Sequence, residues 1–405
     1  MLTRILWLAL VCGAISLPAA AQSAGTAFTL AEALSRARTE SPALAAARAR
    51  IEGARDASAV AGRPLNPFVE LRSENWASGA PGGLPLDLFA TLTQTVELGG
   101  KRGARRAVAA ATIGSATAVE ALAWQEIART VTADYLAALR HREEARALAT
   151  HADSLAEATR VVGRRVEVGS APEADLLKLR TEEARAVVSR TRAELAAARA
   201  LATLGASLGM DVGADQLLRP VVPAAPAEAM VPPSHPELAA ATSAVEAARA
   251  AATVEQARGV PDFSVNAGVK RTSGYNTGVV AVSVPIPLFD RNGVARAMAG
   301  GQLRAAERDR DATVRRLHGH LAAALAAATT LTGRAADAER LLVEPARGAR
   351  DSARAAFAAG AMDVLRLVDA ERVFIDAALV TLTLELDAIS AVIDARLAAG
   401  EEPLP

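Results

Sequence analysis

The chain contains two copies of one unit, and this duplication limits the folds that it can adopt. Each copy opens with an Ala-rich helical segment, continues through alternating apolar and polar residues and a polar junction, and then enters a very long helical segment. The two opening segments start at Ser41-Pro42 and His235-Pro236 and stop near Asn66-Pro67 and Val260-Pro261. Because the order of elements is the same twice, the sequence predicts a pseudo-symmetric architecture.

The composition favours helices over one thick globular core. Hydrophobic residues make up 51% of the 405-residue chain, but only 3% of residues are aromatic and Ala is abundant. Ala has the highest helix propensity and lets helices approach closely. The formal net charge is zero and no basic stripe is present. Nucleic acid is therefore excluded as a partner.

The N-terminus has the pattern of a signal peptide over residues 1–21. Arg4 precedes an apolar stretch, and Ala19 and Ala21 form an A-x-A cleavage pattern. The stretch is too short for a transmembrane helix, and we expect no later apolar run of ~18 residues. The single cysteine, Cys12, lies within this segment. The mature protein is therefore predicted to have no disulfide and no thiol chemistry.

Long helical hairpins are predicted in both copies. Residues 28–60 are expected to be helical, with Thr29 and Glu32 as a capping box. A helix from about 103 to 167 is followed by a turn at Gly169–Pro172 and a return helix over 173–208. Six residues repeat with alternating steps of four and three, which is the spacing of a coiled-coil seam. They are Leu148, Ala152, Leu155, Thr159, Val162 and Val166.

The second copy repeats this plan. A helix from near Val294 carries Leu317, Leu321, Ala324, Ala328 and Leu331 at seam spacing. Pro345 is expected to kink or split it. Gly360 takes the place of Gly169, and a return helix ends near Leu397. The predicted organisation is residues 22–219 as repeat one, 220–234 as a Pro/Ala-rich linker, 235–399 as repeat two and 400–405 as a tail.

Two strands are predicted ahead of each long helix, over 68–76 and 86–98 and over 262–270 and 278–289. Apolar and polar residues alternate in them, and such lengths suit strands that cross a bilayer. An amphipathic sheet on a soluble core is the alternative. Four strands cannot close a barrel, and an open edge in lipid would leave backbone groups unpaired. Small transmembrane barrels begin at about eight strands, so one chain cannot form the barrel, whereas three chains would give twelve strands. Trimerisation is therefore inferred from closure of the backbone hydrogen bonds, on the condition that the strands insert into a membrane.

These features together resemble the TolC family of outer-membrane efflux channels over essentially the whole mature chain. The matching elements are the opening run 28–34, the Ser-Pro and His-Pro starts, the run 284–293 and both Gly turns. The run 97–102 and the Pro-Leu-Phe-Asp-Arg-Asn sequence are more similar to the cobalt–zinc–cadmium (CzcC-type) branch.

The resemblance implies a mainly α fold with a small antiparallel β part. A homotrimer would form a β-barrel in the outer membrane of a Gram-negative bacterium, in contact with its lipid and continuing into a periplasmic α-barrel. It would export substrate, expected to be heavy-metal cations, from an inner-membrane resistance–nodulation–division pump joined through a periplasmic adaptor (membrane fusion protein). A duct for drug export or protein secretion is the alternative within this class. No cofactor is implied.

The resemblance also implies a gate at the periplasmic tip, at the hairpin turns marked by Gly169, Pro172 and Gly360. Asp369 matches one position of an acidic ring, and Arg366 occupies the other acidic position. Asp175 matches the carboxylate of a closing latch. Phe357 stands where the family has the latching tyrosine and has no hydroxyl to donate. The strand-to-helix junctions are marked by Gly99, Gly100, Asp290 and Gly293.

Sequence patterns that would indicate nucleotide binding, metal binding or catalysis are weaker than this resemblance. Gly99-Gly100-Lys101 imitates a phosphate-binding loop but lacks the other required positions, so a turn is expected there. His318 and His320 lie two apart on a predicted helix, where side chains do not face each other, and no metal site is expected. No catalytic pattern appears, so the chain is not expected to be an enzyme. A periplasmic coiled-coil adaptor or scaffold and an exported enzyme remain as rivals of other classes.

Overall fold

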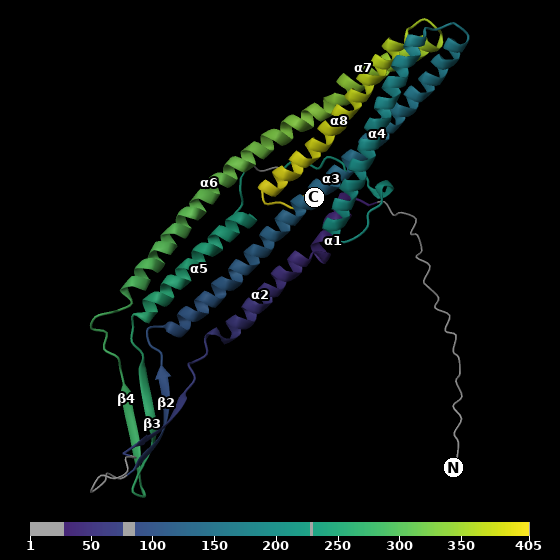
Figure 1. Ribbon diagram of the computed structural model, residues 1–405. Helices are drawn as coiled ribbons and strands as arrows, with labels where there is room; N and C mark the ends of the chain where they lie inside the picture. The colour runs from purple at the N-terminus through teal and green to yellow at the C-terminus, as the bar shows by residue number, and fades with distance from the viewer. Residues whose placement is uncertain (1–27, 76–85, 227–229, 405) are drawn as a thin grey trace, which may run out of the picture.

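The computed structural model describes residues 28–75, 86–226 and 230–404. The molecule is elongated, with a small sheet at one end and two helical hairpin turns at the other (Figure 1). The predicted signal peptide with Cys12, the last residue of the strand expected over 68–76, and part of the linker lie outside the described residues.

The two predicted copies are confirmed by the order of elements. The first contains α1 (Leu30–Glu40), α2 (Pro42–Ala61), β1 (Phe68–Glu74), β2 (Asp87–Val96), α3 (Lys101–Glu167) and α4 (Glu173–Leu208). A short 3₁₀ turn, η1 (Ala214–Gln216), follows. The second contains α5 (Pro236–Arg258), β3 (Phe263–Thr272), β4 (Tyr275–Ser283), α6 (Gly293–Ala338), η2 (Glu339–Val343), α7 (Glu344–Ala358) and α8 (Val364–Ala398).

The first helical region begins as predicted but is not continuous. The Thr29 hydroxyl accepts from the Glu32 N–H at 3.1 Å, and the Glu32 carboxylate accepts from the Thr29 N–H at 2.7 Å, which completes the capping box. The expectation of one helix over 28–60 was wrong, because Ser41 is extended (ψ 121°) and separates α1 from α2. A residue before proline is pushed out of the helical region, here by Pro42.

Pro345 interrupts the long helix of the second copy, as predicted. The structure accommodates it with the π-helical segment η2 directly before α7. Proline lacks an N–H, and its ring clashes with the carbonyl four residues earlier. A π turn shifts the hydrogen-bond pattern by one residue, so the chain continues into α7 without a break.

All four strands form one antiparallel sheet in the order β1-β2-β3-β4. Pairing of β2 with β3 joins the two copies, and a two-residue turn (Ser273 and Gly274, both with positive φ) joins β3 to β4. The strand expected over 278–289 was wrong by several residues at both ends. The prediction missed the tight turn at its start, and Pro285 and Pro287 cannot donate to a strand ladder at its end.

Near the sheet the helices lie side by side in the order α2, α3, α5, α6, and near the turns α3 and α4 lie beside α7 and α8 (Figure 1). The largest core packs α1, α3, α4 and α8 together around Tyr135. A second core lies near the hairpin turns and contains the predicted seam residues Ala152, Leu155 and Val162. The helical hairpins therefore hold the sheet and the turns far apart: α3 alone has 67 residues, about 100 Å at 1.5 Å per residue.

Among the described residues, one helix is long and apolar enough to cross a membrane by composition. An 18-residue window of α3 has a mean hydropathy of 1.3, and 6% of it is buried. No such run was expected from the sequence. However, α3 is far longer than the ~20 residues that span a bilayer, and it packs beside α2, α4 and α5. We interpret the window as the Ala-rich surface of a helix in this layer.

Candidate functional site

The sheet has its apolar side chains on the outside. Strand register places one set of residues on one face, and all of them are exposed: Val69, Leu71, Leu88, Leu92, Val269, Val280 and Val282. Leu71 and Val280 are 78% and 77% exposed. The predicted alternation is confirmed in β2, where Leu88, Ala90 and Leu92 share this face and Thr91 and Thr93 lie on the other. A sheet in water would bury such a face.

The opposite face of the sheet is mainly polar, and the residues of β2 on this face are better covered than those on the apolar face. Asp87 is only 6% exposed and accepts from Lys270 Nζ at 2.7 Å and from the Thr272 hydroxyl. Closer to the helices, Asn266 donates to the Thr93 hydroxyl at 2.9 Å. Polar groups facing inward and apolar groups facing outward are the arrangement of a strand with lipid on one side and an aqueous lumen on the other.

The strand-to-helix junctions of the two copies have matching geometry. Gly100 and Asn292 precede α3 and α6, and both have left-handed backbone conformations, with φ of 76° and 62°. At Gly99 a Cβ would lie 2.7 Å from the Val260 side chain, so only glycine fits. Lys101 forms an ion pair with Asp262 at 2.7 Å rather than an open phosphate site.

The second junction is held by side-chain hydrogen bonds. The Asp290 carboxylate accepts from the Asn292 N–H at 2.8 Å and from the Gly293 N–H at 3.4 Å. The Asn292 amide donates to the Glu255 carbonyl oxygen on α5 at 2.9 Å. These bonds fix where α6 leaves the sheet end of the molecule.

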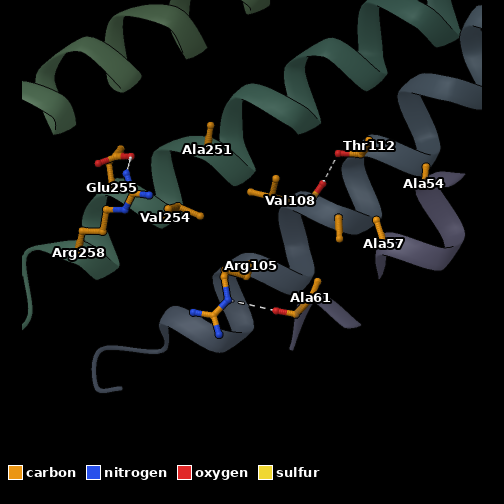
Figure 2. Close-up of a pocket in the computed structure, with 11 residues that line it drawn as sticks. Ala54, Ala57, Ala61, Arg105, Val108, Thr112, Ala251, Val254, Glu255 and Arg258 are labelled. Carbon is orange, nitrogen blue, oxygen red and sulfur yellow. Dashed lines mark hydrogen bonds and ion pairs between the residues drawn. The ribbon is translucent and has the colours of Figure 1, made fainter. Parts of the chain in front are cut away.

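A groove of about 520 Å³ lies between α2, α3 and α5, close to these junctions, and Figure 2 shows the residues that line it. Its walls are mainly Ala and Val side chains, such as Ala57 and Val254. Arg105 donates to the Ala61 carbonyl oxygen at 3.1 Å, and Glu255 is paired with Arg258 at 2.6 Å. Arg105 thus joins α3 to α2, and the Glu255–Arg258 pair lies within α5. Nothing in this lining has the arrangement of a nucleophile and base.

The two hairpin turns lie together at the far end of the molecule (Figure 1). Gly169 and Gly360 both have positive φ, 70° and 76°, directly after α3 and α7. In each turn the next N–H donates to the carbonyl oxygen five residues earlier: Ser170 to Arg165 at 2.7 Å, and Ala361 to Ala356 at 2.9 Å. This is the Schellman pattern, in which glycine avoids the steric cost of a left-handed residue. Pro172 precedes α4 with an extended backbone.

Arg165 of α3 contacts Phe357 of α7. Its guanidinium lies 4.9 Å from the ring centroid and donates to the Phe357 carbonyl oxygen at 3.1 Å. The Phe357 ring is buried in the core near the turns. Phe357, which we predicted to stand at the latching position, is therefore engaged by a cation from the other hairpin.

Two further arginines join the hairpins. Arg354 of α7 donates to the Ser154 hydroxyl on α3 at 2.9 Å and pairs with buried Glu371 of α8. Arg372 of α8 pairs with Glu182 of α4 at 2.8 Å. These cross-hairpin arginines (Arg165, Arg354 and Arg372) were missed in the sequence, because no spacing rule connects residues nearly 200 positions apart.

The remaining predicted gate residues have little contact. Asp369 is exposed at a groove of about 400 Å³ between α4 and α8, beside Arg372 and Lys178. Arg366 is exposed, and its backbone N–H is capped by the Asp363 carboxylate at 2.9 Å. Asp175 is half-buried in the first turn of α4. The structure thus brings Asp369 toward the hairpin interface and leaves Arg366 in solvent.

The described residues contain no group of three or more His, Cys, Asp or Glu that could hold a metal ion. His318 and His320 are both exposed on α6. Burial lowers the pKa of His151 on α3, which lies near the charges of Arg354 and Glu371. Burial also lowers the pKa of His235, whose Nδ1 accepts from the Glu237 N–H at 3.2 Å and caps α5.

Comparison with known families gives a match to the model described as "Outer membrane efflux protein" over residues 33–210 and 233–401. Two curated proteins of Cupriavidus metallidurans are similar. The cobalt-zinc-cadmium resistance protein CzcC is 27% identical over 90% of this chain and 88% of that protein. The nickel and cobalt resistance protein CnrC is 32% identical over 70% of this chain and 69% of that protein.

The fold is also similar to solved structures. The outer membrane protein VceC of Vibrio cholerae superposes with a TM-score of 0.76 at 18% identity. The match covers 92% of this chain and 96% of that one. The helical layer, the small sheet and the paired hairpins are thus the fold of outer-membrane channels.

Proposed function

Because the chain belongs to the outer membrane efflux protein family and lies in the outer membrane, we propose that it forms a homotrimeric exit duct of a tripartite metal-efflux system. The observation that carries this proposal is that the sheet exposes its apolar face and buries polar groups on the other. Leu71 and Val280 are exposed on the apolar face, and Asp87 is buried on the polar face. A periplasmic adaptor or scaffold, which lies in water, would not expose such an apolar face.

Strand directions support closure by three copies. Each neighbouring pair in β1-β2-β3-β4 is antiparallel, so β4 runs antiparallel to β1. The β4 edge of one copy can therefore pair with the β1 edge of the next with the same antiparallel ladder. Three copies satisfy both open edges and give a twelve-stranded barrel, above the lower limit of about eight strands.

The decisive experiment is chemical cross-linking of outer-membrane fractions from cells that express the full chain. We expect a ladder that ends at the trimer and a protein that stays in the membrane after a urea wash. A monomer released into the soluble periplasmic fraction would reject the proposal.

Heavy-metal cations are the proposed cargo, because two relatives are named as metal-resistance proteins. Deletion of the gene should lower tolerance to one or more of zinc, cobalt, cadmium and nickel and leave tolerance to organic drugs unchanged. Loss of drug tolerance alone would favour the drug-export alternative. Cargo would pass as a hydrated ion along polar walls, so no resident metal site is required.

We place the energy source outside this chain. No nucleotide loop is formed at Gly99–Lys101, where Lys101 is engaged with Asp262, so a passive conduit without catalysis fits the described residues. The duct would depend on an inner-membrane resistance–nodulation–division pump and a periplasmic adaptor. Pull-down of the intact trimer should recover both. Residues 1–21 would direct export and be removed.

The hairpin turns are the proposed gate. Gly169, Pro172 and Gly360 shape the turns, and Asp369 is the proposed pore-lining acid. Asp175 and Phe357 do not form the family's hydroxyl–carboxylate latch, because Phe357 has no hydroxyl. The cross-hairpin arginines would hold the gate closed instead. Arg366, exposed at this end, would add positive charge where the family has an acid.

A further inference from the structure

The segment that follows β4, residues 284–289, carries apolar side chains that no other described residue covers. Ile286 is 76% exposed, Leu288 72% and Phe289 100%. The sequence has no charged residue from Gly278 to Phe289, and Asp290 and Arg291 follow immediately. Every second residue from Val280 to Ile286 is an exposed Val or Ile, so the segment extends the apolar face of the sheet toward the helices.

The backbone of this segment is adapted to a place with little water. Pro285 and Pro287 have no N–H, and the Leu288 N–H donates to the Ile286 carbonyl oxygen at 2.9 Å. An unpaired backbone group costs several kcal/mol in hydrocarbon. The prolines thus remove donors from a stretch that has left the strand ladder, while its side chains remain apolar.

We propose that residues 284–289 form an interfacial anchor, which contacts lipid acyl chains of the periplasmic leaflet of the outer membrane. Asp290 and Arg291 then lie at the level of the headgroups. This inference rests on the proposed barrel. Lipid is the occupant because the segment continues the exposed apolar face of the sheet. A neighbouring copy would approach β4 along its hydrogen-bonding edge, whereas side chains stand perpendicular to the sheet.

Site-directed spin labelling tests the anchor directly, because Cys12 is the only cysteine and lies in the predicted signal peptide. A nitroxide is attached to each of three single-cysteine variants, Ile286→Cys, Val280→Cys and Leu177→Cys. Each variant is purified as the trimer and placed in phosphatidylethanolamine/phosphatidylglycerol vesicles. Collision rates with oxygen, which prefers lipid, and with a water-soluble nickel chelate are then measured. Val280 lies on the apolar sheet face, and Leu177 is exposed on α4, far from the sheet.

We expect the ratio of oxygen to nickel collisions at position 286 to lie between those at 280 and 177, clearly above the value at 177. A ratio equal to that at 177 would show that the segment is in water. Low collision rates with both reagents would show that a neighbouring copy covers it. Either result overturns the anchor while position 280 remains in lipid. Position 280 in water would instead reject the barrel itself, and the anchor with it.

Discussion

The guanidinium of Arg165 both stacks on the Phe357 ring, at 4.9 Å, and donates to the Phe357 carbonyl oxygen, at 3.1 Å. It also reaches the Ala358 carbonyl oxygen at 3.4 Å. Carbonyls in the last turn of a helix lack intrahelical partners, so a cation there satisfies them and complements the helix dipole. One α3 side chain thus holds the C-terminal end of α7.

Arg165→Ala should weaken the attachment of α3 to the C-terminal end of α7. Loss of the cation–π contact and of the hydrogen bonds should cost about 1–2 kcal/mol. If this contact holds the gate closed, cells should become more sensitive to a large hydrophilic antibiotic that the outer membrane normally excludes. Arg160→Ala is the matched control, since within the described part of the chain Arg160, on the same helix, pairs only with nearby Glu157. Equal sensitivity of the two variants would remove Arg165 from the gate.

The other two cross-hairpin arginines should differ in their contribution. Arg354→Ala leaves Glu371, almost fully buried, without its cation, and should cost about 2 kcal/mol. Arg372→Ala breaks a largely exposed pair with Glu182 and should cost less than about 1 kcal/mol. Denaturant unfolding of the purified trimer measures both. A larger loss for Arg372→Ala would mean that burial of the carboxylate does not set the strength of these pairs.

An arginine introduced into β1 should impair membrane insertion on the apolar face of the strand but not on the polar face. Leu71→Arg places a charge on the apolar face, where lipid makes it cost about 2–4 kcal/mol near the bilayer midplane. Glu70→Arg places the same side chain one residue away on the polar face and should insert normally. The measurement is the amount of trimer in the outer membrane. Equal amounts for the two variants would mean that neither face contacts lipid.

Acid should weaken the packing around His235. The pKa of His235 is lowered by burial, with Glu237, Arg129 and Arg316 as the nearby charges, so the folded state favours the neutral ring. This contribution to stability is complete above the unfolded pKa of about 6.5 and is lost as the pH falls toward the folded value. Protonation of Nδ1 would also remove the cap on α5.

His235→Asn is the variant that tests this, because Asn is a good N-cap and does not titrate. The free energy of unfolding of the wild type should fall between pH 6.5 and acidic pH, and that of the variant should fall less. Parallel pH profiles would assign the acid sensitivity to carboxylates that are stabilised in their charged form, such as Glu157, whose pKa the hydrogen bond from Arg160 lowers.

Much of the fold was predictable from local patterns. The α4 helix, predicted over 173–208, was found with those bounds, because Pro172 and Gly209 fix its ends within the sequence. The faces of β2 followed from alternation, since successive side chains of a strand point to opposite sides. The break at Ser41 and the end of β4 at Ser283 are local too, since a proline follows each of them within two residues.

The candidate gate could be predicted only in part from the sequence. The turns at Gly169 and Gly360 could be identified, because a left-handed residue at a helix end favours glycine. The contact of Arg165 with Phe357 could not, since an arginine at a helical surface position has many possible partners. Of the predicted charges, Asp369 lies at the hairpin interface and Arg366 does not.

The sequence by itself determined the duplicated plan, the lengths of the helices and which residues share a face, because these depend on neighbours a few positions apart. The tertiary structure decided that β2 pairs with β3, so that two separate strand pairs become one sheet with its apolar face outward. It also decided which arginines bridge the hairpins. Such pairings join distant residues, and their free energy depends on burial and geometry that exist only once the long helices are packed.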